Sequence, residues 1–325
     1  MPVTDHFLVR ISVLHEELNR ALAELDLPET PHYLYAPIRY VNTGQGKRLR
    51  PILVRLTGEA CGANVADLLN AGLAVELLHN FTLVHDDIMD GDNQRHGQPT
   101  VHKQWDESTA ILAGDGLFAL SQLLLLKVCV NPLKALRRFN EATLAVCEGQ
   151  GFDKEFEADS AITLDHYLIM IEKKTGNLIG LCAELGAILG DQPEATIQAL
   201  FNYGLALGKA FQIHDDVLEI TADPEIMGKS LGSDIKAGKQ TILTILAREK
   251  DAGNWGQFCA SVDTSDETNL CRAYRNYFES TGVLNQAIAN AKQYGRQALD
   301  LLEVIPSKSR SVLIEFTDLV LNRKK

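Results

Sequence analysis

Residues 85–90 read HDDIMD and residues 214–219 read HDDVLE, so one pattern of a histidine and three acids occurs twice in the chain. On a helix the three acids of each copy share one face, because side chains at i, i+3 and i+4 are neighbours. These acids are Asp86, Asp87, Asp90, Asp215, Asp216 and Glu219. Like charges at this spacing weaken a helix by roughly 0.2–0.5 kcal/mol per pair. Each copy therefore needs exposure to water, a counter-charge or a metal.

The sequence around the two copies predicts an all-α fold. Long stretches without proline lie between residues 51 and 99, 132 and 193, and 224 and 306, and apolar residues recur in them with helical spacing. No sustained alternation of apolar and polar residues indicates strands. We expect about ten to thirteen helices in a bundle around a central active-site cavity, with the prolines at breaks between helices.

The composition is that of an ordinary globular protein, with 46% hydrophobic and 23% charged residues. A formal net charge of -12 disfavours a nucleic-acid partner. Six cysteines without a C-x-x-C pair are typical of a reducing, cytoplasmic setting. The N-terminal segment does not resemble a secretory signal, and no apolar run approaches the ~20 residues of a membrane span. No low-complexity linker divides the chain, so we expect a single domain over residues 1–325.

Apolar helical turns precede both acidic copies, at residues 81–84 and 211–213. A solvated acidic face is the usual interpretation of one such copy, but a matched pair preceded by apolar turns favours a shared site. Carboxylate oxygens suit Mg²⁺, which is commonly bound by one or two carboxylates together with substrate phosphates and water. Two acidic helices facing one another across a bundle would build one metal site.

Basic residues in turn-like settings accompany the acids, in GKRLRP at residues 46–51, KTG at 174–176 and the GDNQRHGQPT loop that contains Arg95. Lys229 and Lys239 each follow a glycine after the second copy. Each is most often surface charge when taken alone, but together they suggest clamps for a diphosphate. No G-x-S-x-G motif or Cys–His arrangement indicates a covalent intermediate. We therefore expect metal-assisted loss of diphosphate from a substrate with an apolar tail.

Seven segments between about residues 35 and 250 form an ordered series: GKRLRP, ELLHNFTLVHDDIMD, RHGQPTVH, EGQ, KTGNL, FQIHDDVLE and GKSLGSDIKAGKQT. This series resembles the trans-isoprenyl diphosphate synthases, also called polyprenyl synthetases. The resemblance implies an all-helical homodimer that joins isopentenyl diphosphate to an allylic diphosphate. Ionisation assisted by Mg²⁺, head-to-tail addition and proton loss are the implied steps.

The resemblance also implies roles for particular residues. The six acids would hold about three Mg²⁺ ions against the allylic diphosphate, and Arg95, Lys174, Lys229 and Lys239 would contact that leaving group. Isopentenyl diphosphate would occupy a metal-free pocket beside Lys47, Arg50 and His79. Thr175 and Gln212 would stabilise the allylic cation through uncharged oxygen dipoles. The residues expected to act in catalysis are Asp86, Lys174, Thr175, Gln212 and Asp215. The residues expected to bind substrate are Lys47, Arg50, His79, Arg95, His96, Gln150, Lys229 and Lys239.

Two positions depart from the family pattern, since His96 stands where a second arginine is usual and Glu219 where an aspartate is usual. Glutamate is still a hard carboxylate ligand. An unperturbed histidine, with a pKa of about 6.5, is mostly neutral at pH 7, whereas arginine stays charged. We therefore expect weaker binding of isopentenyl diphosphate, with a dependence on pH.

Phe81 and Thr82 are the candidate determinants of product length. Phe81 precedes Asp86 by five residues, which is roughly 7.5 Å along a helix axis. By the resemblance, an aromatic followed by a small residue here implies short products, most often the twenty-carbon geranylgeranyl diphosphate. Farnesyl or longer products are the alternative. The alternative interpretation is that Phe81 is an ordinary core residue.

Three other classes of protein were weighed against this interpretation. A di-iron carboxylate bundle needs two Glu-x-x-His turns, but beside residues 76–79 the chain offers only residues 29–32, which contain Pro31. A class I terpene cyclase would lack the second acidic copy and GKRLRP. A non-catalytic partner subunit would be expected to have lost acids from one copy, and both are complete here.

Overall fold

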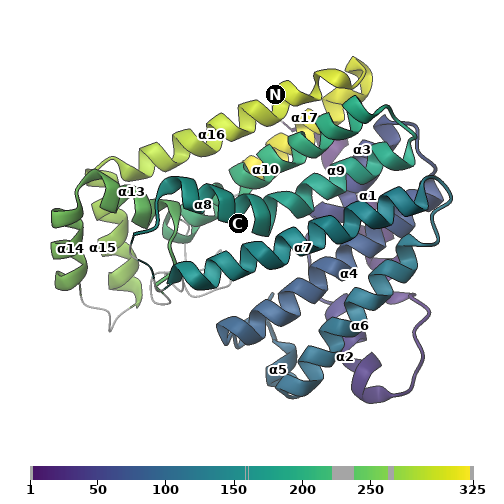
Figure 1. Cartoon of the computed structure of the whole chain (residues 1–325), viewed down its shortest axis with the longest axis horizontal. Coiled ribbons are helices and arrows are strands. Elements are labelled where there is room, and N and C mark those ends of the chain that lie inside the picture. The colour runs from purple at the N-terminus through teal and green to yellow at the C-terminus, as the bar shows by residue number, and fades with distance from the viewer. Residues whose placement is uncertain (1–2, 158, 160, 222–237, 263–266, 323–325) are drawn as a thin grey trace. The chain divides into compact units, whose positions relative to one another are not determined.

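The computed structural model describes residues 3–157, 159, 161–221, 238–262 and 267–322 (Figure 1). Nearly all regular structure in these residues is helical, which confirms the predicted all-α class. Lys229, one of the predicted diphosphate ligands, lies outside the described residues. Figure 1 labels the helices used below.

The elements of the first part of the chain surround the first acidic motif. They are α1 (Asp5–Ala23), α2 (His32–Asn42), α3 (Leu49–Ala60), α4 (Val65–Asp90), β1 (Gln94–Arg95), β2 (Gln98–Pro99), α5 (Val101–Gln104) and α6 (Glu107–Leu125). Those that follow are α7 (Pro132–Glu157), α8 (Leu164–Ile171), the π-helical turn η1 (Glu172–Gly176), α9 (Asn177–Leu189), α10 (Glu194–Thr221), α13 (Ile242–Lys250), α14 (Ala252–Ser261), α15 (Glu267–Ser280), α16 (Val283–Leu301), η2 (Leu302–Val304) and α17 (Ser307–Leu321).

Two compact units share the chain. The first comprises Met1–Asn140, Leu181–Phe201 and Val304–Glu315, and the second Glu141–Gly180, Asn202–Glu303 and Phe316–Lys325. The boundaries fall inside α7, α9, α10, η2 and α17, not in linkers. The predicted organisation as a single domain stays a prediction.

Side-chain caps explain where several helices begin. Asn64 accepts a hydrogen bond from the Ala66 amide at the start of α4, and Asp106 accepts one from Thr109 at the start of α6. Such caps typically stabilise a helix by about 1 kcal/mol. At its other end α4 stops at Gly91, whose φ of 69° is the left-handed conformation that favours glycine. The first acidic motif is thereby fixed at the end of α4.

In the first unit, α4 and α6 pack closely. A Cβ atom on Gly114 of α6 would lie 2.2 Å from Nε2 of His85, so only glycine leaves room for that histidine. The middle of α4 is buried on all sides, with Ala71, Ala74, Leu77 and Leu78 at 0% exposure. The acidic end of α4 therefore projects from a helix that the core holds rigidly.

In the second unit, the start of α9 lies against α10 at paired glycines. A Cβ atom on Gly208 would lie 2.6 Å from Cα of Gly176, and one on Gly204 would lie 2.5 Å from Cα of Gly180. These contacts leave no room for side chains between the two backbones. They bring the KTG segment next to the helix that carries the second acidic motif.

The prediction that every proline marks a break is wrong for Pro37, which lies inside α2 and is buried. Proline removes one backbone hydrogen bond in a helix interior and usually disfavours the position. Here the ring belongs to the buried face of α2, beside Ile38 at 0% exposure. Periodicity in the sequence did not reveal this packing.

By length and composition, α6 is apolar enough to cross a membrane, contrary to the expectation that no stretch approaches a span. Only 44% of its most apolar window is buried in the structure. A core helix of a soluble protein passes the same test, so this is weak evidence for a membrane span. The uncovered part of α6 needs an explanation of its own.

Candidate active site

Both acidic motifs lie at the C-terminal ends of helices. Asp90 is the last residue of α4, and Glu219 lies in the last turn of α10, which ends at Thr221. Neither last turn contains a basic residue. The negative end of the helix dipole disfavours a carboxylate there by typically 0.3–1 kcal/mol. Both helix ends are therefore places where a bound cation would be stabilising.

The oxygen donors of these acids fit Mg²⁺ in kind. Within the described part of the chain, no group of three or more His, Cys, Asp or Glu side chains is close enough to hold a metal ion by itself. Any metal at these helix ends would need further oxygen ligands from substrate phosphates and water, as Mg²⁺ sites commonly have.

The middle acid of the first motif, Asp87, forms an ion pair with an arginine. It is 3% exposed, and its Oδ1 accepts a hydrogen bond from Nε of Arg95 at 2.5 Å. Arg95 also contacts Asp92 at 3.3 Å. Burial raises the pKa of Asp87 to about 6, while Arg95 opposes this shift. Arg95 thus lies beside the first acidic motif, as predicted.

The middle acid of the second motif, Asp216, is also buried, with 6% exposure. Its Oδ2 accepts hydrogen bonds from the Tyr167 hydroxyl at 2.7 Å and the Ile242 amide at 3.2 Å. Its Oδ1 accepts one from Nε2 of Gln212 at 3.1 Å. The outer acids of both motifs are partly exposed, namely Asp86, Asp90, Asp215 and Glu219.

A short hairpin positions Arg95. Strands β1 and β2 pair antiparallel, with Arg95 opposite Gln98. The two residues between them, His96 and Gly97, have φ values of 52° and 78°, which is the pattern of a type I′ turn. The predicted turn at Gly97 is confirmed, with two short strands in addition. His96 is exposed at its tip.

Arg48 of GKRLRP has a structural role that the sequence did not reveal. Its Nη1 pairs with Glu76 at 2.6 Å, both side chains being under 5% exposed. The same guanidinium donates to Oδ1 of Asn19 and to the carbonyls of Asn42 and Gly44. Arg48 therefore holds the loop that presents exposed Lys47. The ion pair also removes Glu76 from any metal-binding Glu-x-x-His turn.

Arg50 and His79 lie together, as the sequence predicted. Nη1 of Arg50 is 3.0 Å from Nε2 of His79. Burial lowers the pKa of both groups, and the charges of Arg50, Arg95 and His96 lower that of His79 further. His79 is therefore neutral, and its Nε2 accepts a hydrogen bond from Nη1 of Arg50. The positive charge gathered around it would be relieved by an anion.

The KTG segment adopts the π-helical turn η1, a distortion frequent at functional sites. Nζ of Lys174 donates to Asp153 at 2.6 Å, and Oγ1 of Thr175 donates to Oε1 of Gln212 at 2.9 Å. The structure thus brings the predicted pair of Thr175 and Gln212 into direct contact. Asp153, which neutralises Lys174, was not identified from the sequence.

The EGQ motif lies against this turn. A Cβ atom on Gly149 of α7 would lie 2.2 Å from the backbone nitrogen of Lys174, so the glycine permits a close approach of α7 to η1. Gln150 is buried beside it, with 8% exposure. Lys239 is described in the loop that precedes α13, where its carbonyl accepts a hydrogen bond from Thr241.

Phe81 contacts an aromatic residue that the sequence analysis missed. Its ring centroid lies 5.4 Å from that of Phe118 on α6 and 4.8 Å from that of His85. Phe81 is half-buried, and Oγ1 of Thr82 donates to the His79 carbonyl at 2.8 Å. Only the packing of α4 against α6 reveals Phe118.

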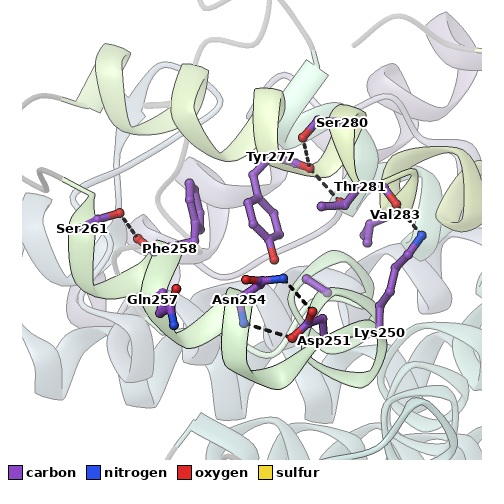
Figure 2. Close-up of a pocket in the computed structure, with 11 residues that line it drawn as sticks. Lys250, Asp251, Asn254, Gln257, Phe258, Ser261, Tyr277, Ser280, Thr281 and Val283 are labelled. Carbon is purple, nitrogen blue, oxygen red and sulfur yellow. Dashed lines mark hydrogen bonds between the residues drawn. The ribbon is translucent and has the colours of Figure 1, made fainter.

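A cavity of about 800 Å³ lies elsewhere in the second unit, lined by residues of helices α13 to α16 (Figure 2). Lys250, Asn254, Phe258 and Tyr277 are among its lining residues. Asn254 is held there by Asp251, to which its Nδ2 donates at 2.6 Å. None of the predicted site residues that the structure describes lines this cavity, so we treat it as separate from the candidate active site.

In the first unit an acidic helix end accompanies the buried Arg50–His79 pair, and in the second unit another accompanies the Thr175–Gln212 pair. Each of these groups suits a phosphorylated substrate. A family model described as polyprenyl synthetase matches residues 31–277. The geranylgeranyl diphosphate synthase of Methanosarcina mazei is 40% identical over 314 residues, which cover 94% of this chain and 95% of that protein.

Two solved structures are similar over nearly the whole chain. Geranylgeranyl pyrophosphate synthetase from Pyrococcus horikoshii has a TM-score of 0.91 and 34% identity, covering 98% of this chain and 99% of that one. A polyprenyl synthase from Caulobacter crescentus, complexed with calcium and isoprenyl diphosphate, has a TM-score of 0.89 and 28% identity, covering 100% and 99%. The chain belongs to the polyprenyl synthetase family and is a prenyltransferase. The di-iron and terpene cyclase alternatives are thereby set aside.

Proposed function

We propose that this enzyme condenses isopentenyl diphosphate with an allylic diphosphate and forms mainly geranylgeranyl diphosphate. The observation that carries the proposal is the placement of two acid sets at helix C-termini without basic residues in the last turn. The similarity to a geranylgeranyl diphosphate synthase over 94% of the chain supports the product. Farnesyl or longer products are the alternative, and a non-catalytic partner subunit is the other.

Mg²⁺ is the proposed metal, about three ions in all, and when bound it neutralises the charge of the departing diphosphate. The partly exposed acids Asp86, Asp90, Asp215 and Glu219 are the first candidates to hold it. Asp87 and Asp216 belong to the same acid sets, but each has an oxygen engaged by internal donors. The solved relative complexed with calcium and isoprenyl diphosphate supports a divalent cation.

The basic residues divide between two diphosphates. Lys47, Arg50, His79 and His96 are proposed to bind isopentenyl diphosphate without metal, because the positive charge around His79 favours an anion. The proposed ligands of the allylic diphosphate are Arg95, Lys174, Gln150, Lys229 and Lys239. Arg95 keeps further N–H donors while it pairs with Asp87, since a guanidinium has five.

The proposed reaction begins when the allylic carbon–oxygen bond breaks and its electron pair leaves with the diphosphate. Thr175 and Gln212 present oxygen dipoles that stabilise the positive charge left on the allyl group. The double bond of isopentenyl diphosphate then forms the new carbon–carbon bond, and loss of a proton restores a neutral hydrocarbon chain. Neither oxygen is nucleophilic enough to trap the cation readily, which suits their role.

The test is to incubate the protein with labelled isopentenyl diphosphate, Mg²⁺ and each allylic primer in turn, and to measure the length of the products. We expect products of mainly twenty carbons. Mainly fifteen-carbon or longer chains would support the alternative products. Absence of any prenyl product with every primer would instead support the non-catalytic subunit.

A homodimer in the cytoplasm is also proposed. The exposed residues Leu112 and Leu123 of α6 share one face with Leu126, the C-cap of that helix, because spacings of eleven and three return to nearly the same side of a helix. Exposed apolar patches of this kind mark interaction sites. None of the six cysteines forms a disulfide bond in the described residues, which supports a reducing compartment.

A further inference from the structure

Tyr167 of α8 is buried at 1% exposure, and its hydroxyl donates to Oδ2 of Asp216 at 2.7 Å. The same carboxylate accepts hydrogen bonds from Nε2 of Gln212 at 3.1 Å and the Ile242 amide at 3.2 Å. Three donors from α8, α10 and the start of α13 therefore meet one buried acid. Both oxygens of Asp216 are therefore acceptors for internal donors.

Because Oδ1 of Asp216 accepts from Nε2 of Gln212 at 3.1 Å, the NH₂ group of Gln212 is turned toward Asp216. This orientation places Oε1 of Gln212 on the opposite side, where it accepts from Oγ1 of Thr175 at 2.9 Å. The reversed amide would place a positive NH₂ group beside Thr175. Asp216 thus selects the orientation that presents an oxygen.

The backbone around this pair is already fixed. Gly208, one turn before Gln212, lies against Gly176, the neighbour of Thr175, with room for no Cβ atom. With the two backbones fixed, the orientation of the Gln212 amide depends on rotation of its side chain. Control of that rotation falls to Asp216 and to the donors that orient Asp216.

We propose that Tyr167 is a positioning residue for prenyl transfer, which holds Asp216 so that the Gln212 amide directs its oxygen toward the developing allylic cation. The inference rests on the proposed function. It assigns the second acid of HDDVLE an internal role in addition to charge. Through the Ile242 amide, the same carboxylate also anchors the start of α13, three residues after Lys239.

The first experiment compares Tyr167→Phe with the wild-type enzyme. We expect kcat to fall about tenfold, the effect of losing one charge-assisted hydrogen bond, while KM for both substrates stays unchanged. Tyr203→Phe is the matched control, because Tyr203 is 0% exposed and its hydroxyl bonds to Thr317 in the same unit. Wild-type kcat in Tyr167→Phe, or an equal loss in Tyr203→Phe, would overturn the proposal.

A double-mutant cycle tests whether Tyr167 acts through Gln212. In a Gln212→Leu background, Tyr167→Phe should cause no further loss of kcat, since the group it positions is gone. If Tyr167→Phe lowers kcat by the same factor in both backgrounds, Tyr167 acts by another route and the inference is overturned.

A readout independent of activity separates this inference from the proposed function. In protein labelled with ¹⁵N-glutamine, the side-chain amide of Gln212 should exchange slowly with solvent in the wild type and faster in Tyr167→Phe. Equal exchange in both proteins would overturn the positioning role, even if prenyl transfer is normal. Changed exchange in a protein that makes no prenyl product would overturn the proposed function alone.

Discussion

Asp87 and Asp216 occupy the same position in the two acidic motifs, and each is buried against donors from another element. Their neighbours Asp86 and Asp215 are partly exposed. A buried carboxylate without hydrogen bonds would be costly, so these internal donors are what make the middle positions tolerable. The outer acids are partly exposed, and we expect them to be the first to meet a ligand.

Replacing Asp86 with Ala is expected to lower kcat at least about a hundredfold, because a group that supports the leaving diphosphate is lost. Circular dichroism should show the same helical content. Glu16→Ala, which removes an exposed acid on α1, should leave kcat unchanged. The wild-type enzyme should also lose activity in excess EDTA, and activity that persists there would contradict the metal dependence.

His79 should make the stability of the enzyme fall at low pH. Its pKa is well below the ordinary value of 6.5, so below about pH 6.5 the unfolded chain binds a proton that the folded chain does not. The free energy of unfolding is therefore lost as pH falls from about 6.5 toward the folded pKa. Urea unfolding at several pH values measures this loss.

His79→Gln is the matched variant for this measurement, because its Oε1 can still accept from Arg50 but does not titrate. The variant should show a smaller loss of stability between about pH 6.5 and 5. Identical slopes for variant and wild type would show that His79 protonates normally in the folded protein.

His96 occupies a left-handed position with φ of 52°, where histidine and asparagine are tolerated better than most residues. If its protonated form attracts isopentenyl diphosphate, KM for that substrate should rise with pH, and His96→Arg should flatten the rise. His96→Asn keeps the turn without charge and should give a high KM at every pH. The same profile in all three proteins would exclude contact with the substrate.

Between elements, the packing of α4 against α6 decides what lies below the first acidic motif. Phe81 and Phe118 face one another from the two helices at 5.4 Å. The position of Phe81 on α4 was predictable from the spacing to Asp86, since a helix fixes distances along its own axis. Phe118 was not predictable, because no local pattern states which residue of a second helix it meets.

Phe118→Ala and Phe81→Ala are both expected to lengthen the products. Each substitution removes one ring of the Phe81–Phe118 pair, which we expect to limit how far the growing chain can extend. Mass analysis of the dephosphorylated alcohols measures chain length. Phe139→Leu, which alters a residue at 0% exposure on α7, should cost stability and leave the length unchanged. If both alanine variants fold, stay active and keep the wild-type distribution, the two rings are only core.

For the site too, the sequence could reveal residues within one local motif but not the partners that they meet on other helices. Asp86 and Asp90 could be proposed as site residues because their motif is short and regular, and Thr175 and Gln212 because the family resemblance implies them. The partners Arg48–Glu76 and Tyr167–Asp216 join residues 28 and 49 positions apart, and only tertiary packing decides such pairs. Lys174 was correctly placed beside Thr175, yet its pairing with Asp153 depends on the close approach at Gly149.

At the scale of the whole molecule, the feature to explain is the row of exposed leucines on α6 and its C-cap. The exposed fractions of Leu112, Leu123 and Leu126 are 42%, 58% and 51%, and full burial of such a side chain contributes roughly 1.5–3 kcal/mol. The chain carries a net charge of -12, which opposes non-specific association. Self-association would therefore need a specific apolar contact, and we propose this face of α6 for it.

The prediction is that Leu123→Glu combined with Leu126→Glu converts a dimer into a monomer. Two carboxylates in the centre of an apolar contact would lose their hydration without gaining partners, which strongly disfavours association. Sedimentation equilibrium measures the mass, and Leu133→Glu, which alters a residue 77% exposed near the start of α7, serves as the comparison. A wild-type protein that is monomeric at micromolar concentration, or a double variant that remains dimeric, would rule out this face as the subunit contact. A monomeric variant with an unchanged far-ultraviolet spectrum would show that the uncovered leucines of α6 serve assembly and not a membrane.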